Sequence, residues 1–194
     1  MTELLFRDDS YRQSCEARVI AVDERGIQLD ATVFYFTSGG QPGDAGRLAH
    51  ADGSPLDIAD TVKGAAPGEV IHVLAPGHAP PEVGARMIAT IDWDRRYRHM
   101  RLHTCMHLLC AAVGAPVTGG QIHGDRARLD FDMQGGTIDK AVLEARLNAL
   151  VAAGHPVLPR WITDEELAAN PALVRTMSVR PPAGAGRVRL LDIP

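Results

Sequence analysis

The sequence predicts an α+β protein in which a strand-rich N-terminal part precedes a part that mixes helices and strands. From residue 16 to about 91, short apolar runs are separated by glycine- and proline-rich turns, a spacing typical of small barrels and sandwiches. After Trp93 the apolar period changes from two residues towards that of a helix. We therefore expect a glycine-rich, barrel-like β subdomain over residues 1–92 and an α/β domain over residues 93–194.

The expected strands of the first part are joined by recognisable turns, such as Asp23–Gly26. Most of them are short apolar runs, and one alternates between apolar and polar residues before becoming apolar. They are Ala17–Val22, Ile27–Phe36, a run around Ile58, Val70–Leu74 and Arg86–Ile91.

The most glycine-dense stretch of the chain is Thr37–Gly46. Glycines permit positive φ and let a ligand or another backbone approach closely. An ordinary surface loop is the alternative explanation. The stretch matches neither a phosphate-binding loop nor a dinucleotide fingerprint, so we expect no nucleotide cofactor.

Two histidines, His103 and His107, lie one helical turn apart in a segment with helical character. Side chains at this spacing share a helix face, so both imidazoles could bind one zinc ion. Thr104 follows His103, so the glutamate of the metallopeptidase motif is absent. Cys110 stands about 10 Å along the axis from His103, too far to join a tetrahedral site. Two unrelated core histidines are the alternative.

A locally basic stretch, residues 94–101, precedes these histidines and contains four arginines and one tyrosine. Arginine and an aromatic ring together are suited to phosphates and bases of single-stranded nucleic acid. A solvated helix start is the simpler explanation. The arginines are Arg95, Arg96, Arg98 and Arg101.

The remaining chain predicts alternating turns, strands and helices. Thr137 is expected to cap a helix, and Thr163 with Glu166 forms a capping-box pattern before a short helix. The expected elements are a turn over 117–124, a strand over 126–132, a helix over 138–153, a strand over 156–162 and a last strand over 186–192.

Composition narrows the class of protein further. The 194 residues carry a net charge of −4, which excludes a general electrostatic attraction to nucleic acid. The three cysteines are widely spaced, so we expect a reducing, cytoplasmic location. Neither a signal peptide nor an apolar run long enough for a membrane is visible.

Four motifs in order resemble the editing domain of alanyl-tRNA synthetase and its free-standing AlaX relatives. The first is the segment TVFYFTSGGQPGDAG at Thr32–Gly46, and the second is RLHTCMHLL at Arg101–Leu109. The third combines GGQIH with RLDFD, and the fourth is VRLLD near the end. Phe36 and Ser38 depart from the proline and glycine usual in the family's first motif.

This resemblance implies a two-layer α/β editing domain that hydrolyses Ser-tRNA(Ala) or Gly-tRNA(Ala) in trans, with the tRNA(Ala) acceptor end as partner. His103 and His107 would be zinc ligands, and Gln41 and Gln121 polar residues at the substrate. The site would include substrate contacts from Gly39, Gly40, Arg95, Arg98 and Arg101.

The family's other two zinc ligands come from a C-x-x-x-H element that would follow Asp192, whereas the sequence ends at Pro194. We therefore expect one zinc ion whose third and fourth ligands are not in this sequence, in a C-terminally truncated domain. The alternative function is a catalytically impaired module that binds the tRNA acceptor, and a third is a structural remnant with neither activity. The oligomeric state is not indicated by the sequence.

Overall fold

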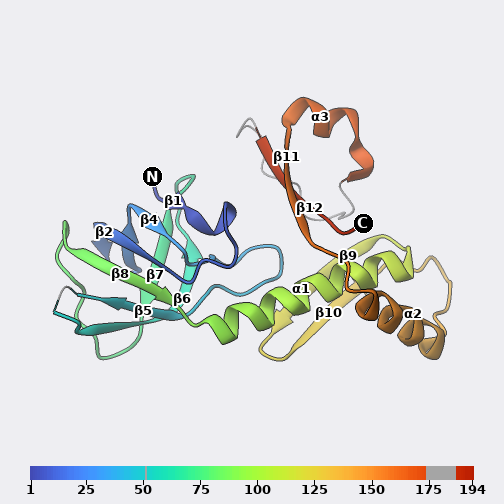
Figure 1. The fold of residues 1–194 in the computed structure, drawn as a ribbon, viewed down its shortest axis with the longest axis horizontal. Helices are drawn as coiled ribbons and strands as arrows, with labels where there is room; N and C mark the ends of the chain where they lie inside the picture. The colour runs from blue at the N-terminus through green and yellow to red at the C-terminus, as the bar shows by residue number, and fades with distance from the viewer. Residues whose placement is uncertain (51, 174–186) are drawn as a thin grey trace. The chain divides into compact units, whose positions relative to one another are not determined.

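The structure, a computed structural model, describes residues 1–50, 52–173 and 187–194. The chain divides into two compact units, and the division falls within helix α1 (Trp93–Val113). The barrel unit comprises Met1–Arg101 with Ile122–Asp125, and the α/β unit comprises Leu102–Gln121 with Arg126–Pro194. Figure 1 shows the order of the elements along the chain. The expected boundary between a β subdomain ending at residue 92 and an α/β domain starting at residue 93 stays a prediction.

Six antiparallel strands close into a barrel in the order β2-β3-β7-β6-β5-β8. In Figure 1 they run from blue to green. The barrel confirms the small-barrel prediction, although β5 was not expected. The strands are β2 (Ser14–Asp23), β3 (Gly26–Leu29), β5 (Gly46–Ala49), β6 (Pro55–Lys63), β7 (Val70–Leu74) and β8 (Arg86–Ile91).

The barrel core forms because alternate residues of each strand point inward. Exposed and buried positions alternate along β2 and along β8. Val19, Leu29, Leu48 and Ala89 are at most 1% exposed and belong to one hydrophobic cluster. Trp93, the first residue of α1, is partly buried and packs against the same cluster, which attaches the start of the helix to the barrel core.

The predicted strand over residues 27–36 is wrong in its second half. β3 ends at Leu29, and β4 (Ala31–Thr32) pairs in parallel with β1 (Glu3–Leu4), which leads into the short helix η1 (Leu5–Arg7). Residues 33–36 lie outside the strands. Their backbone donors find side chains instead, since the Phe34 amide donates to Thr32 Oγ1 and the Tyr35 amide to the Asp44 carboxylate.

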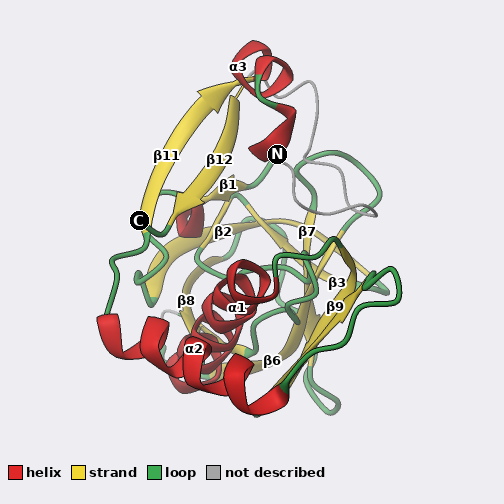
Figure 2. Ribbon diagram, turned by 90° about the vertical axis from the view of Figure 1, so that its right-hand side faces the viewer, coloured by secondary structure: helices red, strands yellow, loops and turns green. Residues whose placement is uncertain are grey.

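The α/β unit contains two strand pairs and three helical segments in addition to its part of α1. β9 pairs with β10, and β11 pairs antiparallel with β12. Figure 2 shows α3 at one end of the β11–β12 ribbon. The elements are β9 (Val117–His123), β10 (Arg126–Phe131), α2 (Lys140–Ala153), β11 (Leu158–Thr163), α3 (Asp164–Ala169), η2 (Pro171–Leu173) and β12 (Arg187–Asp192).

Two local predictions in this unit are corrected and one is confirmed. The turn expected over 117–124 is mostly strand β9, and Asp139 rather than Thr137 caps α2, accepting from two backbone amides. The capping box of Thr163 and Glu166 is present. Gly186, the predicted start of the last strand, lies outside the described residues. Within the described ranges, no helix is long and apolar enough to cross a membrane.

Candidate functional site

A tight turn forms the tip of the glycine-dense stretch. Ser38 and Gln41 pair as an antiparallel bridge, with amide-to-carbonyl distances of 3.1 and 2.9 Å. Gly39 and Gly40 between them have φ of 58° and 79°, the signs required by a type I′ turn. The Gly40 carbonyl accepts from the Ile122 amide at 2.8 Å. The turn is therefore held at both its base and its tip, and Gln41 is only 4% exposed.

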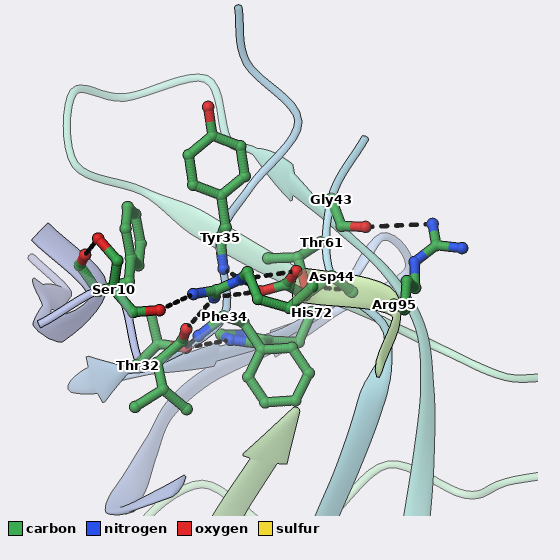
Figure 3. Close-up of polar contacts among 12 residues, drawn as sticks. Ser10, Thr32, Phe34, Tyr35, Gly43, Asp44, Thr61, His72 and Arg95 are labelled. Atoms are coloured by element: carbon green, nitrogen blue, oxygen red, sulfur yellow. Dashed lines mark hydrogen bonds and ion pairs between the residues drawn. The ribbon is translucent and has the colours of Figure 1, made fainter. Parts of the chain in front are cut away.

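A buried ion pair connects the same stretch to the first turn of α1. Arg96 Nε donates to both oxygens of the Asp44 carboxylate at 3.0 and 2.8 Å, and Arg96 Nη2 donates to one of them as well. Further guanidinium donors reach the carbonyls of Val33 (2.6 Å) and Ser10 (3.1 Å). Figure 3 shows Asp44 and Ser10 within this network of polar contacts. Both side chains are at most 2% exposed, so their charges are matched by each other and by backbone groups.

The neighbouring Arg95 makes a second connection between α1 and the glycine-dense stretch. Asp92 caps the helix by accepting from the Arg95 amide at 3.0 Å. The Arg95 guanidinium donates to the Gly43 carbonyl at 3.2 Å, and its buried Nε has no hydrogen-bond partner among the described residues. A Cβ on Gly43 would lie 2.0 Å from the Thr61 carbonyl oxygen. Only glycine fits at position 43, because any side chain would collide with the backbone of Thr61. The Gly43 carbonyl can therefore lie where Arg95 donates to it.

A neutral histidine is buried in the barrel beside this network. His72 Nδ1 donates to the Ile27 carbonyl at 3.0 Å, because a carbonyl can only accept. Nε2 therefore accepts from the Thr32 hydroxyl at 2.8 Å, and the same hydroxyl oxygen accepts from the Phe34 amide. Complete burial lowers the pKa of His72 to about 4. The ring is neutral near pH 7 and serves the packing of the barrel.

The two candidate zinc ligands lie on the part of α1 that belongs to the α/β unit. The rings of His103 and His107 are stacked, with centroids 5.0 Å apart and planes inclined by 17°. Burial, with a smaller effect from His107, lowers the pKa of His103 to about 4. His103 is therefore neutral at pH 7, the form in which imidazole binds a metal.

The two histidines are ligands of a type that zinc binds, but they are fewer than a zinc site requires. Neutral imidazole nitrogen is a usual zinc donor, and a zinc site takes at least three protein ligands. Among the described residues, no group of three or more histidine, cysteine or acidic side chains could hold a metal ion. Cys105 and Cys110 on the same helix are not joined in disulfides. The described chain thus contributes two donors.

Comparison with the sequences of known proteins shows the family to which this chain belongs. The model for class II (A) tRNA synthetases matches residues 6–95. The alanyl-tRNA editing protein AlaX-M of Methanosarcina acetivorans is 35% identical over 204 residues, covering 100% of this chain and 82% of that protein. AlaX-M of Saccharolobus solfataricus is 34% identical over 187 residues, covering 94% and 78%. The chain belongs to the AlaX family of alanyl-tRNA editing proteins.

The larger enzymes of this family match over a smaller share of their length. The alanine–tRNA ligase of Pyrobaculum aerophilum is 37% identical over 175 residues, covering 82% of this chain but 19% of that enzyme. The AlaX-like chain thus corresponds to one part of such a ligase and to most of a free-standing AlaX-M protein. This agrees with the resemblance stated from the motifs.

The other predicted site residues of this AlaX protein are divided between the two units. Gln41, Gly39 and Gly40 belong to the barrel unit, whereas Gln121 is exposed on β9 in the α/β unit. Arg98 is exposed, and the Arg101 guanidinium lies 5.9 Å from the centre of the Tyr97 ring. Their proposed roles at the substrate stay predictions.

Sequence reasoning missed Asp44 as a partner of Arg96 and treated Arg96 as a possible phosphate contact. The structure corrects this, because the Arg96 guanidinium is buried and already neutralised. The two residues are 52 positions apart, and no local pattern pairs them. The sequence therefore offered no local signal for this pair, which only the fold brings together.

Proposed function

We propose that this AlaX protein hydrolyses the ester of mischarged tRNA(Ala), with serine or glycine as the misplaced amino acid, as a free-standing enzyme. The observation that carries the proposal is the 35% identity, over the whole chain, to a protein named as an alanyl-tRNA editing protein. The acceptor end of tRNA(Ala) is then the partner, and the cytoplasm, where tRNA is charged, is the expected location.

We further propose that His103 and His107 hold a zinc ion. The stacked imidazoles of His103 and His107 on one face of α1, and the neutral state of His103, support this assignment. Zinc bound there would supply a Lewis acid to the ester. The histidines themselves have one task, which is to hold the ion from a rigid helix face, and the remaining ligands are not among the described residues.

Gln41 and Gln121 are proposed to contact the aminoacyl group. A glutamine amide offers both a donor and an acceptor, which suits an ester and an amino group. The support for Gln41 is its position next to a turn that hydrogen bonds hold on both sides. Gly39 and Gly40 would allow the substrate to approach the backbone of that turn, as positive-φ glycines do at ligand sites.

Arg95, Arg98 and Arg101 are proposed to contact tRNA phosphates. The support is their spacing of three residues along α1, which places them on neighbouring turns of one helix, with Arg98 and Arg101 exposed. Phosphate contacts would position the tRNA and would not select its sequence. Arg96 is not part of this set.

The test of the metal site is hydrolysis of Ser-tRNA(Ala) by the purified protein with added zinc. We expect His107→Ala to lower the rate by at least about 100-fold, whereas His155→Ala, an exposed histidine of the α/β unit, leaves it unchanged. Equal rates of hydrolysis for the two variants would show that His107 is not needed for the reaction and would refute the proposed zinc site.

The second candidate is an acceptor-binding module without hydrolysis. The observation in its favour is that the described residues supply only two metal donors. A gel-shift assay with acceptor-stem RNA separates the two functions. Binding to the RNA while the ester of Ser-tRNA(Ala) decays at the buffer rate, even with zinc present, would favour the module.

A further inference from the structure

Three aromatic side chains form a cluster at the start of α1, within the barrel unit. Trp93 and Tyr97 are four residues apart on the helix, and their rings stack with centroids 5.5 Å apart and an angle of 23°. Tyr11 joins from the segment before β2, with its ring 5.5 Å from Trp93 and 6.4 Å from Tyr97. We call Tyr11, Trp93 and Tyr97 the aromatic cluster.

The cluster has a fixed inner ring and two open outer rings. Trp93 packs against the hydrophobic core of the barrel. Tyr11 is 60% exposed and Tyr97 is 41% exposed. The Tyr11 backbone is held by its amide, which donates to the Asp9 carboxylate at 2.8 Å. Covering the core does not require two tyrosines with this much exposed ring surface, so the outer rings are available to a ligand.

Arginines supply positive charge beside these rings. The Arg101 guanidinium lies 5.9 Å from the centre of the Tyr97 ring, and Arg98 is exposed one residue after Tyr97. Two carboxylates near the cluster are engaged by backbone amides, Asp9 by Tyr11 and Asp92 by Arg95. Asp94 remains as an exposed acid on the same turn as Trp93.

Flat rings beside guanidinium groups match one ligand chemistry better than the others. Nucleobases stack on aromatic side chains, and phosphates pair with arginine. A duplex hides its base faces, so the match is to unpaired nucleotides. An acidic peptide would use the arginines but would gain little from the open tyrosine rings.

We propose that the aromatic cluster, together with Arg101, is a binding site for unpaired nucleotides of RNA. Under the proposed function, on which the identity of the RNA rests, these are the unpaired nucleotides at the 3′ end of the tRNA. Bases stack on both Tyr11 and Tyr97, and Arg101 contacts an adjoining phosphate.

The test uses the fluorescence of Trp93. The chain has two tryptophans, so Trp161→Phe leaves Trp93 as the only one. Titration with the single-stranded RNA ACCA, which carries no amino acid, should quench this fluorescence, and the same strand in a blunt duplex should not. Tyr11→Ala and Tyr97→Ala should each weaken binding by about 5- to 150-fold, the range expected for loss of one stacked base. Tyr11→Phe, which keeps the ring, should bind normally.

A charge-matched pair of variants tests the phosphate contact. Arg101→Gln should weaken ACCA binding and reduce the slope of log affinity against log salt by about 0.7. Arg86→Gln removes an exposed arginine from β8 on the same unit and should change neither. Circular dichroism and melting curves check that every variant is folded.

The proposal fails if ACCA does not quench Trp93, if folded Tyr11→Ala and Tyr97→Ala variants bind like the parent, or if the duplex binds equally well. These outcomes do not depend on hydrolysis, because the probe has no ester. Ring-dependent binding in a protein that does not hydrolyse Ser-tRNA(Ala) would support the site and refute the proposed enzyme. Hydrolysis of Ser-tRNA(Ala) by a protein whose RNA binding does not depend on Tyr11 and Tyr97 would support the proposed enzyme and refute the aromatic site.

Discussion

The two units of this chain differ in how their side chains are stabilised. In the described residues, both clusters of buried apolar side chains lie in the barrel unit, and the arginine of its buried ion pair also donates to two backbone carbonyls. In the α/β unit, α2 has no buried residue, and Val142 and Leu158 are 65% and 51% exposed. The candidate zinc ligands nevertheless belong to this second unit. Stability and the candidate metal chemistry are therefore concentrated in different parts of the chain.

The largest difference between the units should appear when an ion pair is broken in each. Arg96→Ala leaves the buried Asp44 carboxylate without its cation and should lower the free energy of unfolding by about 3–5 kcal/mol. Arg160→Ala breaks the pair with Asp192, whose side chains are 45% and 46% exposed, and should lower it by less than about 1 kcal/mol. Denaturant unfolding measures both, and similar losses would refute the contrast.

Truncation of an apolar side chain should give the next largest difference. Leu48 is fully buried in the barrel core, so Leu48→Ala should lower the free energy of unfolding by about 2–5 kcal/mol. Val142→Ala on α2 should change it by no more than about 0.5 kcal/mol, because most of that side chain is already in water. A large loss for Val142→Ala would show that α2 is covered in solution.

Acidification should weaken the barrel unit through His72. Its pKa falls from the ordinary 6.5 to about 4 in the folded chain, so between these values the unfolded chain binds the proton and the folded chain does not. The stabilisation is complete above pH 6.5 and is lost as the pH falls towards 4, by up to about 3 kcal/mol.

This sign can be checked with His72→Gln. Unfolding free energies measured from pH 7 to pH 4 should fall less steeply for the variant than for the parent. A residual slope is expected, since burial also lowers the pKa of His99 and of His103. An unchanged slope would mean that His72 takes up its proton in the folded state.

Alanine substitutions at one glycine in each unit should differ least in their effect on stability but clearly in their effect on hydrolysis. Gly40 and Gly154 have φ of 79° and 64°, so alanine at either position should cost about 1–2 kcal/mol of unfolding free energy. Gly154 ends α2 in open space, whereas Gly40 lies in the turn beside Gln41. Hydrolysis of Ser-tRNA(Ala) should fall at least about tenfold for Gly40→Ala and stay unchanged for Gly154→Ala, as single-turnover assays would show.

The sequence predicted the elements that local patterns encode. The regular spacing of short apolar runs between glycine- and proline-rich turns indicated the barrel, and the helical period indicated α1. β9 was missed because Gly119 and Gly120 resemble a turn. A Cβ on Gly120 would lie 2.9 Å from Met106 Cε, so this glycine serves close packing of the strand against α1, and only the tertiary contact reveals that.

In the candidate site, too, the residues that local patterns mark were predictable and the contacts between distant segments were not. His103 and His107 were predictable, because one helical turn separates them. The Asp44–Arg96 pair and the contact of Tyr11 with Trp93 join segments that are distant in sequence, and neither carries a local signal. Gln41 was predictable as a residue of the glycine-dense stretch, whereas its burial depends on the fold of that stretch.

The most direct test of the proposed editing activity is a single-turnover comparison of Ser-tRNA(Ala) with Ala-tRNA(Ala), using the 194-residue chain with zinc added. The account predicts that the serine ester is hydrolysed at least about 100-fold faster than in buffer, while the alanine ester decays at close to its buffer rate. Decay of both esters at the buffer rate, or equally fast hydrolysis of both, would contradict it.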